Sequence, residues 1–231
     1  MGIAEGLASV RSQIAAAARR AGRDPASVTL IAVSKGFPPA AAAAAAAAGA
    51  VDLGENRVQE ALEKMEALGE GALAIRWHLI GRLQTNKVRL LQGRFTLFHA
   101  LDRAELADAL QRRLTAEGRR LPVLMEVNVG GETTKAGTTA ADAPPLARRI
   151  AACDALELRG LMTVAPPVPE PEAARPFFSE LRHLRDHIAA DIGRPLPELS
   201  MGMSGDYPVA VEEGATLVRV GRAIFGERNP A

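Results

Sequence analysis

Lysine is rare in this chain, so each lysine is a candidate for chemistry. The 231 residues include 24 arginines but only four lysines, at positions 35, 64, 87 and 135. Arginine keeps its proton at any useful pH, whereas a lysine at the end of an apolar strand can lose its proton and act as an amine nucleophile. Lys35 is the lysine that follows a fully apolar run, in the segment LIAVSK. The position of Lys35 indicates a Schiff base with a carbonyl ligand, or alternatively a charged strand end that reaches solvent.

Two glycine-containing segments near the C-terminus have the residue types of a phosphate site. In SMGMSGDYP, Ser204 can cap the helix that follows and donate its hydroxyl to a phosphate oxygen. In VRVGRAIFG, Gly221 opens a terminal helix whose first amides, including that of Arg222, can face the same anion. Ordinary turn chemistry is the alternative for each loop alone. Together they favour a phosphate site.

A phosphate site beside an amine nucleophile suggests a phosphorylated aldehyde, and pyridoxal 5'-phosphate (PLP) is the commonest such cofactor. Two other functions stay open. A class I aldolase-like lyase would use Lys35 as a Schiff base with a phosphorylated sugar bound by the Ser204 and Gly221 loops. A structural or partner-binding barrel would use these residues only as loop chemistry. Colour separates PLP from the sugar, because a pyridoxal imine absorbs visible light and a sugar imine does not. A structural barrel would be colourless and would not respond to PLP.

The elements that must position these residues follow a repeating strand and helix pattern. A leading helix is expected over about 2–21, and further helices over the alanine run 40–48, over 103–117 and over 172–190. The expected strands cover 28–34, 51–53, 76–80, 95–100, 122–128, 156–163, 198–200 and 216–220. Eight such units predict an α/β fold, a (β/α)₈ TIM barrel with an extra N-terminal helix. A doubly wound open sheet is the alternative, because the second and seventh strands are short.

In such a barrel the C-terminal ends of the strands form the ligand pocket. The polar residues expected there, besides Lys35 and Ser204, are Glu55, Asn56, His78, Asn128 and Arg219. His99 ends the fourth strand and is expected in the core or at the mouth. The segment from Thr85 is expected to begin a helix that faces the ligand side or a partner.

Composition and the N-terminal sequence exclude several classes of protein. The net charge of +1 argues against a nucleic-acid or membrane-surface protein. The N-terminus carries Glu5 and Arg11 where a secretory signal needs apolar residues, so a cytoplasmic protein is expected. Cys153 is the only cysteine, and nothing around it indicates a nucleophile. His183 and His187 have the spacing of a helical metal pair, but their charged neighbours favour a solvated helix face.

Seven motifs together resemble those of the pyridoxal phosphate homeostasis proteins, which are similar to the barrel domain of alanine racemase. They are AVSK (32–35), GENRVQE (54–60), WHLIGRLQTNK (77–87), VNVGGETTKAG (127–137), GLMTV (160–164), SMGMSGD (200–206) and VRVGRAIFG (218–226). The motifs cover nearly the whole chain in the family's order, which makes them far more specific than any one alone.

The resemblance implies a type III PLP-binding barrel, with residues 1–231 forming one PLP-binding domain. It implies that Lys35 forms the internal aldimine, that Ser204, Gly221 and the Arg222 backbone hold the phosphate, and that Asn56 lies near the ring hydroxyl. It also implies that Arg219 faces the pyridine nitrogen. A guanidinium there disfavours a protonated ring, which is then a poorer electron sink for chemistry on amino acids.

The function that this resemblance implies is to carry and buffer PLP in vitamin B6 homeostasis, without robust catalysis. A PLP-dependent racemase is the alternative, but it needs a second base. The only tyrosine, Tyr207, is expected to pack or cap, and no closing domain is expected beyond the barrel. A monomer that meets apo PLP enzymes transiently is expected. One departure is Phe37, where many members have a second basic residue, whereas Lys135 matches a lysine that the family keeps near the mouth.

Overall fold

A computed structural model describes residues 2–91, 93–132 and 136–227. The strands are β1 Thr29–Val33, β2 Asp52–Glu55, β3 Arg76–Leu79, β4 Leu97–Leu101, β5 Leu121–Glu126, β6 Leu156–Met162, β7 Glu198–Ser200 and β8 Leu217–Val220. The α-helices are α1 Ile3–Arg20, α2 Pro39–Ala47, α3 Val58–Leu68, α4 Ala104–Ala116, α5 Ala143–Ala151, α6 Arg175–Ile192, α7 Tyr207–Glu212 and α8 Arg222–Phe225. The 3-10 helices are η1 Pro25–Ser27, η2 Gly69–Ala74, η3 Thr85–Leu90 and η4 Pro171–Ala174.

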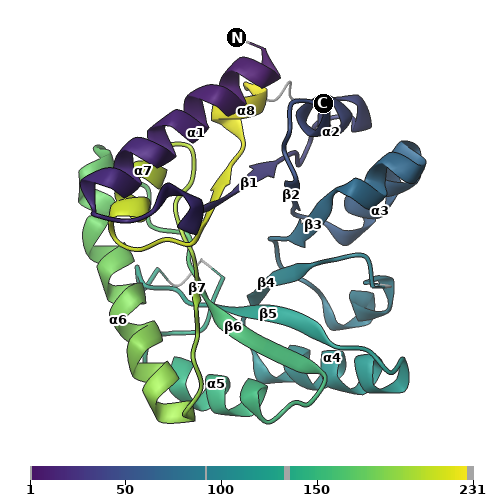
Figure 1. Cartoon of the computed structure of the whole chain (residues 1–231). Coiled ribbons are helices and arrows are strands. Elements are labelled where there is room, and N and C mark those ends of the chain that lie inside the picture. Colours follow the sequence, from purple (N-terminus) through teal and green to yellow (C-terminus); the bar gives the residue numbers. More distant parts are fainter. Residues whose placement is uncertain (1, 92, 133–135, 228–231) are drawn as a thin grey trace.

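Among the described residues, the strands form one closed parallel barrel in the order β1 to β8 (Figure 1). The first and last strands close it, with Thr29 beside Leu217 and Ala32 beside Val220. The (β/α)₈ prediction is therefore confirmed, and the alternative of an open doubly wound sheet is wrong. The short β2 and β7 are strands, of four and three residues, because each pairs with both of its neighbours.

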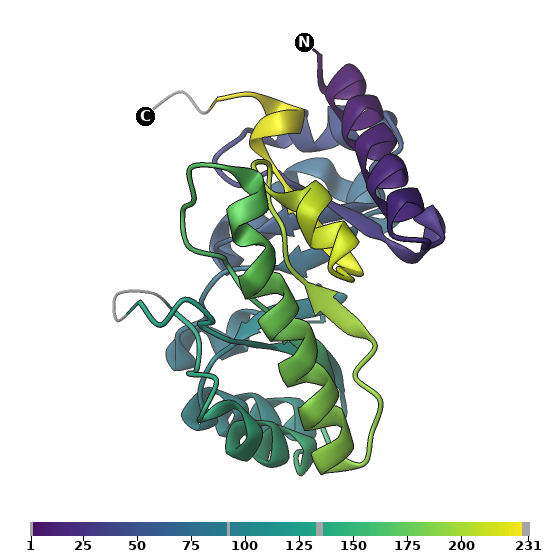
Figure 2. The ribbon, with the colours of Figure 1, turned by 90° about the vertical axis from the view of Figure 1, so that its left-hand side faces the viewer.

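The barrel strands carry apolar residues on both faces, as expected where helices cover a parallel sheet. Every residue of β4 and of β8 is buried, and so is every residue of β5 except Pro122. The helices lie outside the ring of strands (Figure 1). Helix α1 buries Leu7, Val10 and Ile14 at helical spacing and packs against α7 and α8, which Figure 2 shows from the side. The predicted leading helix is confirmed.

Two connections differ from the sequence prediction. The segment from Thr85 forms the short 3-10 helix η3, which buries Val88 and leaves Thr85 and Asn86 exposed. With so little apolar surface, the segment lacks the face that stabilises an α-helix. The helix expected over 172–190 divides into η4 and α6, because the η4 residues before Arg175 close a tighter 3-10 turn.

Candidate functional site

Lys35 lies in the turn directly after β1, at the C-terminal end of the barrel. The amide of Ser34 donates to the carbonyl of Gly54 on β2, so the ladder continues to the residue before the lysine. The chain then turns, with Gly36 at a φ of 74° and the Phe37 amide donating to the Ser34 carbonyl. The Lys35 side chain is partly buried. The lysine therefore extends from a fixed strand end, as its position in the sequence predicts.

A buried polar cluster holds the backbone on both sides of Lys35. On the N-terminal side, the Ser34 hydroxyl donates to Glu55 Oε1 over 2.5 Å, and Lys64 Nζ donates to the Ser34 carbonyl oxygen over 2.7 Å. On the C-terminal side, the Gly36 amide donates to Glu60 Oε1 over 2.6 Å. Lys64 also bonds both carboxylates, at 2.7 Å and 3.0 Å. Glu55 and Glu60 of the motif GENRVQE, together with Lys64, therefore fix the backbone on both sides of Lys35.

The electrostatics of this cluster depend on Lys64. Burial raises the pKa of Glu55, and its hydrogen bonds from Lys64 and Ser34 oppose that rise. The second oxygen of the Glu55 carboxylate is buried without a hydrogen-bond partner among the described residues. An ionised pair this deeply buried is costly unless both charges stay together. The Lys64 ammonium is therefore needed to balance the charge of the buried Glu55 carboxylate.

The loops after β7 and β8 meet through Ser204. The backbone amide of Ala223, in α8, donates to Ser204 Oγ over 3.3 Å. Gly221 lies against the end of β1, since a Cβ placed on it would come within 3.1 Å of the Val33 carbonyl oxygen. The prediction that Ser204 caps the helix following it is wrong. Helix α7 begins after Asp206, whose carboxylate accepts from the Met203 amide instead.

Phe37 joins the lysine turn to α8. Its ring lies 5.3 Å from that of Phe225, centroid to centroid, with the planes tilted by 31°. The ring contact and the contact of Gly221 with β1 therefore place three segments at the same mouth of the barrel. They are the turn of Lys35, the loop of Ser204 and Gly221. Lys135 lies outside the described residues.

Arg219 lies below this mouth, inside the barrel, and is 4 % exposed. Its Nη1 donates to Ser200 Oγ over 2.6 Å and its Nη2 to the Thr163 carbonyl oxygen over 2.7 Å. Burial lowers the pKa of Arg219 to about 10, although the carboxylates of Glu126 and Asp206 act in the opposite direction. The guanidinium is therefore still charged at neutral pH.

Glu126 is a second titratable group of this region, and sequence reasoning missed it because MEV is an ordinary strand pattern. Burial raises its pKa to about 7, and Asp102 adds to that rise while Arg219 and Arg82 oppose it. Its Oε2 atom is buried with no hydrogen-bond partner in the described part of the chain. The group thus changes charge near neutral pH.

Other residues predicted at the mouth have different surroundings. Asn56 follows β2, and its backbone oxygen and side chain lie so close to Gly81 that a Cβ there would clash with both. Asn128 Nδ2 donates to the Glu132 carbonyl, so this side chain closes a turn. His78 was expected at the mouth, but it lies buried inside the barrel against His99, because its register places it beside Gly54 of β2.

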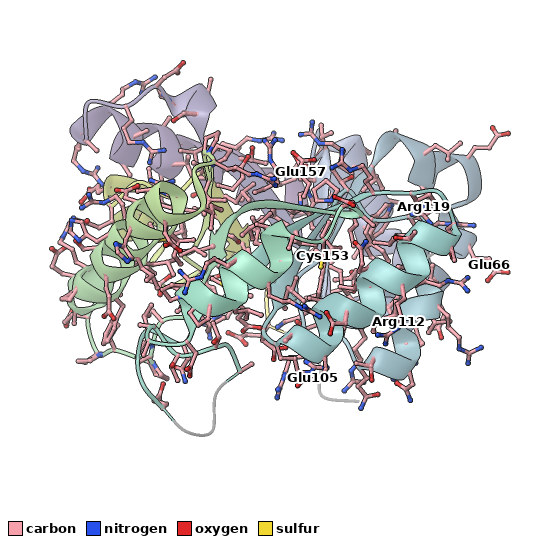
Figure 3. All side chains as sticks on the ribbon, turned by 90° about the horizontal axis from the view of Figure 1, so that it is seen from below. Glu66, Glu105, Arg112, Arg119, Cys153 and Glu157 are labelled. Atoms are coloured by element: carbon pink, nitrogen blue, oxygen red, sulfur yellow. The ribbon has the colours of Figure 1, made fainter. Side chains whose placement is uncertain are left out.

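Several weaker candidates are also placed. His183 and His187 are exposed on α6, and the described residues hold no group of metal-ligating side chains. Cys153, labelled in Figure 3, is buried after α5, and burial raises the pKa of its thiol. Gln84 and Lys87 line a cavity of about 990 Å³ with Arg57 of the α3 N-terminus. Within the ranges described, no helix is both long and apolar enough to cross a membrane.

A closed parallel barrel with a lysine after β1, an arginine on β8 and a serine loop beside α8 defines the class of alanine racemase-like barrels. The family described as "Alanine racemase, N-terminal domain" matches residues 6–229. The alanine racemase of Corynebacterium glutamicum shares this fold, with a TM-score of 0.71 at 17% identity, over 97% of this chain and 62% of that one.

Closer relatives share one name. The pyridoxal phosphate homeostasis proteins of Aquifex aeolicus and Pseudomonas aeruginosa are 45% and 44% identical, over 99% and 98% of this chain and 99% and 96% of theirs. PipY of Synechococcus elongatus, solved with PLP bound, is 38% identical, with a TM-score of 0.86 over 97% of this chain and 100% of that one. The chain therefore belongs to the pyridoxal phosphate homeostasis protein family.

Proposed function

We propose that this protein binds PLP at the barrel mouth, holds it as a Schiff base on Lys35, and carries and buffers it in intracellular vitamin B6 homeostasis. The observation that carries the proposal is the meeting of the Lys35 turn with the Ser204 and Gly221 loops, through Phe37, Phe225 and the pairing of β1 with β8. PipY, which matches 97% of this chain, was solved with PLP bound, and this supports the PLP-binding part of the proposal.

The residues present fit this cofactor. PLP, when bound, supplies an aldehyde that condenses with an amine, with loss of water, and a ring that can withdraw electrons. In the proposed site, Lys35 supplies the amine, and Ser204, Gly221 and the Arg222 backbone hold the phosphate. Asn56 would contact the ring hydroxyl. The buried oxygen of Glu126 without a partner, together with the charged Arg219, gives the floor of the mouth polar groups that an aromatic nitrogen heterocycle can use.

We propose further that catalysis by this chain alone is weak. Arg219, which is charged at neutral pH, would disfavour protonation of a ring nitrogen beside it, so a bound ring would accept electrons poorly. Tyr207 is the only tyrosine, and it is 3 % exposed, with a pKa that burial raises. A buried phenol with a raised pKa is a poor second base for racemisation. A cytoplasmic monomer that meets apo enzymes transiently, with residues 1–231 as one PLP-binding domain, completes the proposal.

The direct test is the visible absorbance of the purified protein with added PLP, followed by borohydride reduction and peptide mapping. We expect a yellow band and a reduced label on Lys35. Lys35→Ala should remove the band, whereas the matched control Lys87→Ala, which changes a lysine of the cavity beside α3, should keep it. Label spread over several amines would contradict the assignment of Lys35.

A second assay separates carrying from catalysis. With saturating PLP, racemisation and transamination of common L-amino acids should stay far below ordinary enzymatic rates. Rates of about 1 per second or faster would make the protein an enzyme. A colourless protein that turns over a phosphorylated sugar would instead indicate the aldolase-like lyase.

A further inference from the structure

Five buried side chains form a continuous row of hydrogen bonds across the barrel interior. Arg219 Nη1 lies 2.6 Å from Ser200 Oγ, and Ser200 Oγ lies 2.9 Å from His99 Nδ1. His99 Nε2 lies 3.0 Å from His78 Nδ1, and the His78 Nε2 atom lies 2.9 Å from Asp52 Oδ1. The members come from β8, β7, β4, β3 and β2, so the row joins strands far apart in sequence.

This row extends from the ligand mouth to the opposite end of the barrel. Arg219 lies below the Lys35 mouth, whereas Asp52 is the first residue of β2 and bonds Arg76, the first residue of β3, at 2.6 Å and 2.8 Å. The Arg76 side chain is 56% exposed and lines a cavity of about 310 Å³ at that end. Ser200 and His99 in the middle are fully buried. A hydrogen atom without an acceptor there would be costly.

The chemistry of the two ends fixes the direction of every bond in the row. Arginine can only donate, and an ionised carboxylate can only accept. His78 Nε2 therefore donates to Asp52, and the Nδ1 atom of a neutral His78 accepts from His99 Nε2. The Nδ1 atom of a neutral His99 then accepts from the Ser200 hydroxyl, whose oxygen accepts from Arg219. In this arrangement both histidines are neutral, and each has its proton on Nε2. The hydroxyl hydrogen of Ser200 and both ring hydrogens then have an acceptor.

The alternative direction leaves a buried hydrogen unsatisfied. If His78 were doubly protonated, His99 would have to donate from Nδ1 to Ser200, and the Ser200 hydroxyl hydrogen would have no acceptor in the row. A second cation would also lie near Arg219. Burial, with the nearby His78 and Arg219, lowers the pKa of His99 well below its ordinary value. Burial alone would raise the pKa of Asp52, but the hydrogen bonds of His78 and Arg76 lower it, which keeps the acceptor ionised.

We infer that Asp52, His78, His99 and Ser200 are positioning residues that orient Arg219 for its ligand through this one-directional row. Because Ser200 donates its hydroxyl hydrogen to His99, the Ser200 oxygen can act only as an acceptor toward Arg219 Nη1. The Thr163 carbonyl fixes Nη2, so the guanidinium has one orientation. The orientation of Arg219 toward a ligand rests on the proposed function, whereas the direction of the hydrogen bonds in the row is independent of it.

Nitrogen NMR of the histidine rings in the cofactor-free protein tests the direction. In the wild type at neutral pH, we expect His78 and His99 to be neutral with the proton on Nε2. Asp52→Asn removes the negative charge that favours the proton on His78 Nε2 but keeps the shape of the side chain, so the fraction of both rings with the proton on Nε2 should fall, and the two rings should change together. Arg76→Gln is the matched control, because it changes the same end of the barrel but keeps the carboxylate. Wild-type rings with the proton on Nδ1, or a charged ring, would overturn the inferred direction.

The positioning role has its own readout in the PLP-loaded protein. We expect Asp52→Asn and Ser200→Ala to shift the visible band of bound PLP or the pH midpoint of that band, and Arg76→Gln to leave both unchanged. Ser200→Thr keeps a hydroxyl and should restore the wild-type spectrum. Altered histidine protons with a wild-type spectrum would refute the positioning role. A wild-type protein with no band would refute the proposed function instead, while the NMR result would still stand.

Discussion

Lys64 Nζ lies 2.7 Å from the carbonyl oxygen of Ser34, the residue immediately before Lys35. One lysine therefore holds the backbone beside the other, and its ammonium also forms ion pairs with Glu55 and Glu60. The chain has four lysines, and this cluster gives a buried one a structural task. Changes to Lys64 should consequently affect both stability and the site of Lys35.

Lys64→Met should destabilise the protein strongly, because Glu55 would stay buried without its counter-charge. Loss of one partner of a buried pair costs about 3–5 kcal/mol. The double variant Glu55→Gln, Lys64→Met should recover much of this loss, since no charge is left buried. Denaturant unfolding of the two single variants and the double variant measures the coupling. Lys87→Met is the matched control, and an equal loss in that variant would argue against the cluster.

Glu126 should make stability depend on pH near neutrality. Its pKa is raised to about 7 in the folded protein, so between its unfolded and folded pKa values the folded state binds the extra proton. Stability from this group is therefore full at low pH and falls as pH rises through 7, by an amount on the order of 3 kcal/mol. Glu126→Gln should unfold like the wild type near pH 5 and be more stable near pH 8. A wild-type advantage at pH 8 would reverse the sign and exclude this account.

The contact between Phe37 and Phe225 should contribute to ligand affinity, because it joins the lysine turn to α8. Aromatic pairs of this kind are worth about 0.5–1.5 kcal/mol beyond their buried area, which corresponds to a several-fold change in Kd. Titration of PLP into Phe37→Ala, Phe225→Ala and the double variant gives the coupling energy. Phe37→Leu keeps the apolar volume and separates ring contact from simple packing. Strictly additive effects would show that the two rings act independently.

Gly6→Ala in α1 should destabilise the protein, although alanine normally favours a helix over glycine. A Cβ at Gly6 would lie 2.9 Å from the Ala223 carbonyl oxygen and 3.0 Å from Ile224 Cα, both backbone atoms of α8. Forcing these helices apart should cost about 1–3 kcal/mol. Thermal unfolding measures it, with the exposed Ser9→Ala as the control. A gain in Tm for Gly6→Ala would mean that α8 can move without cost.

The sequence predicted the barrel because each strand and helix has its own local pattern. It also predicted that Lys35, Ser204 and Gly221 follow strands, because strand ends are recognisable. Lys64 was missed, since a lysine in an amphipathic helix has the same pattern whether it reaches solvent or a buried carboxylate. The partners of His99 were missed for a similar reason. They come from β3 and β7, and only barrel closure sets their distances. The prediction that Ser204 caps α7 was wrong, because the Ser204 hydroxyl accepts from an amide of α8 instead.

The pairing of β1 with β8 has a consequence for how the protein is made. Lys35 leaves the ribosome early, whereas Gly221 and α8 are among the last segments to be synthesised. Contacts between segments so distant in sequence form late in folding, since they require the loop between them to close first. An unfinished chain thus displays the lysine without the loops beside which it folds. Colour acquired in the presence of PLP would therefore report that synthesis and closure of the ring are complete.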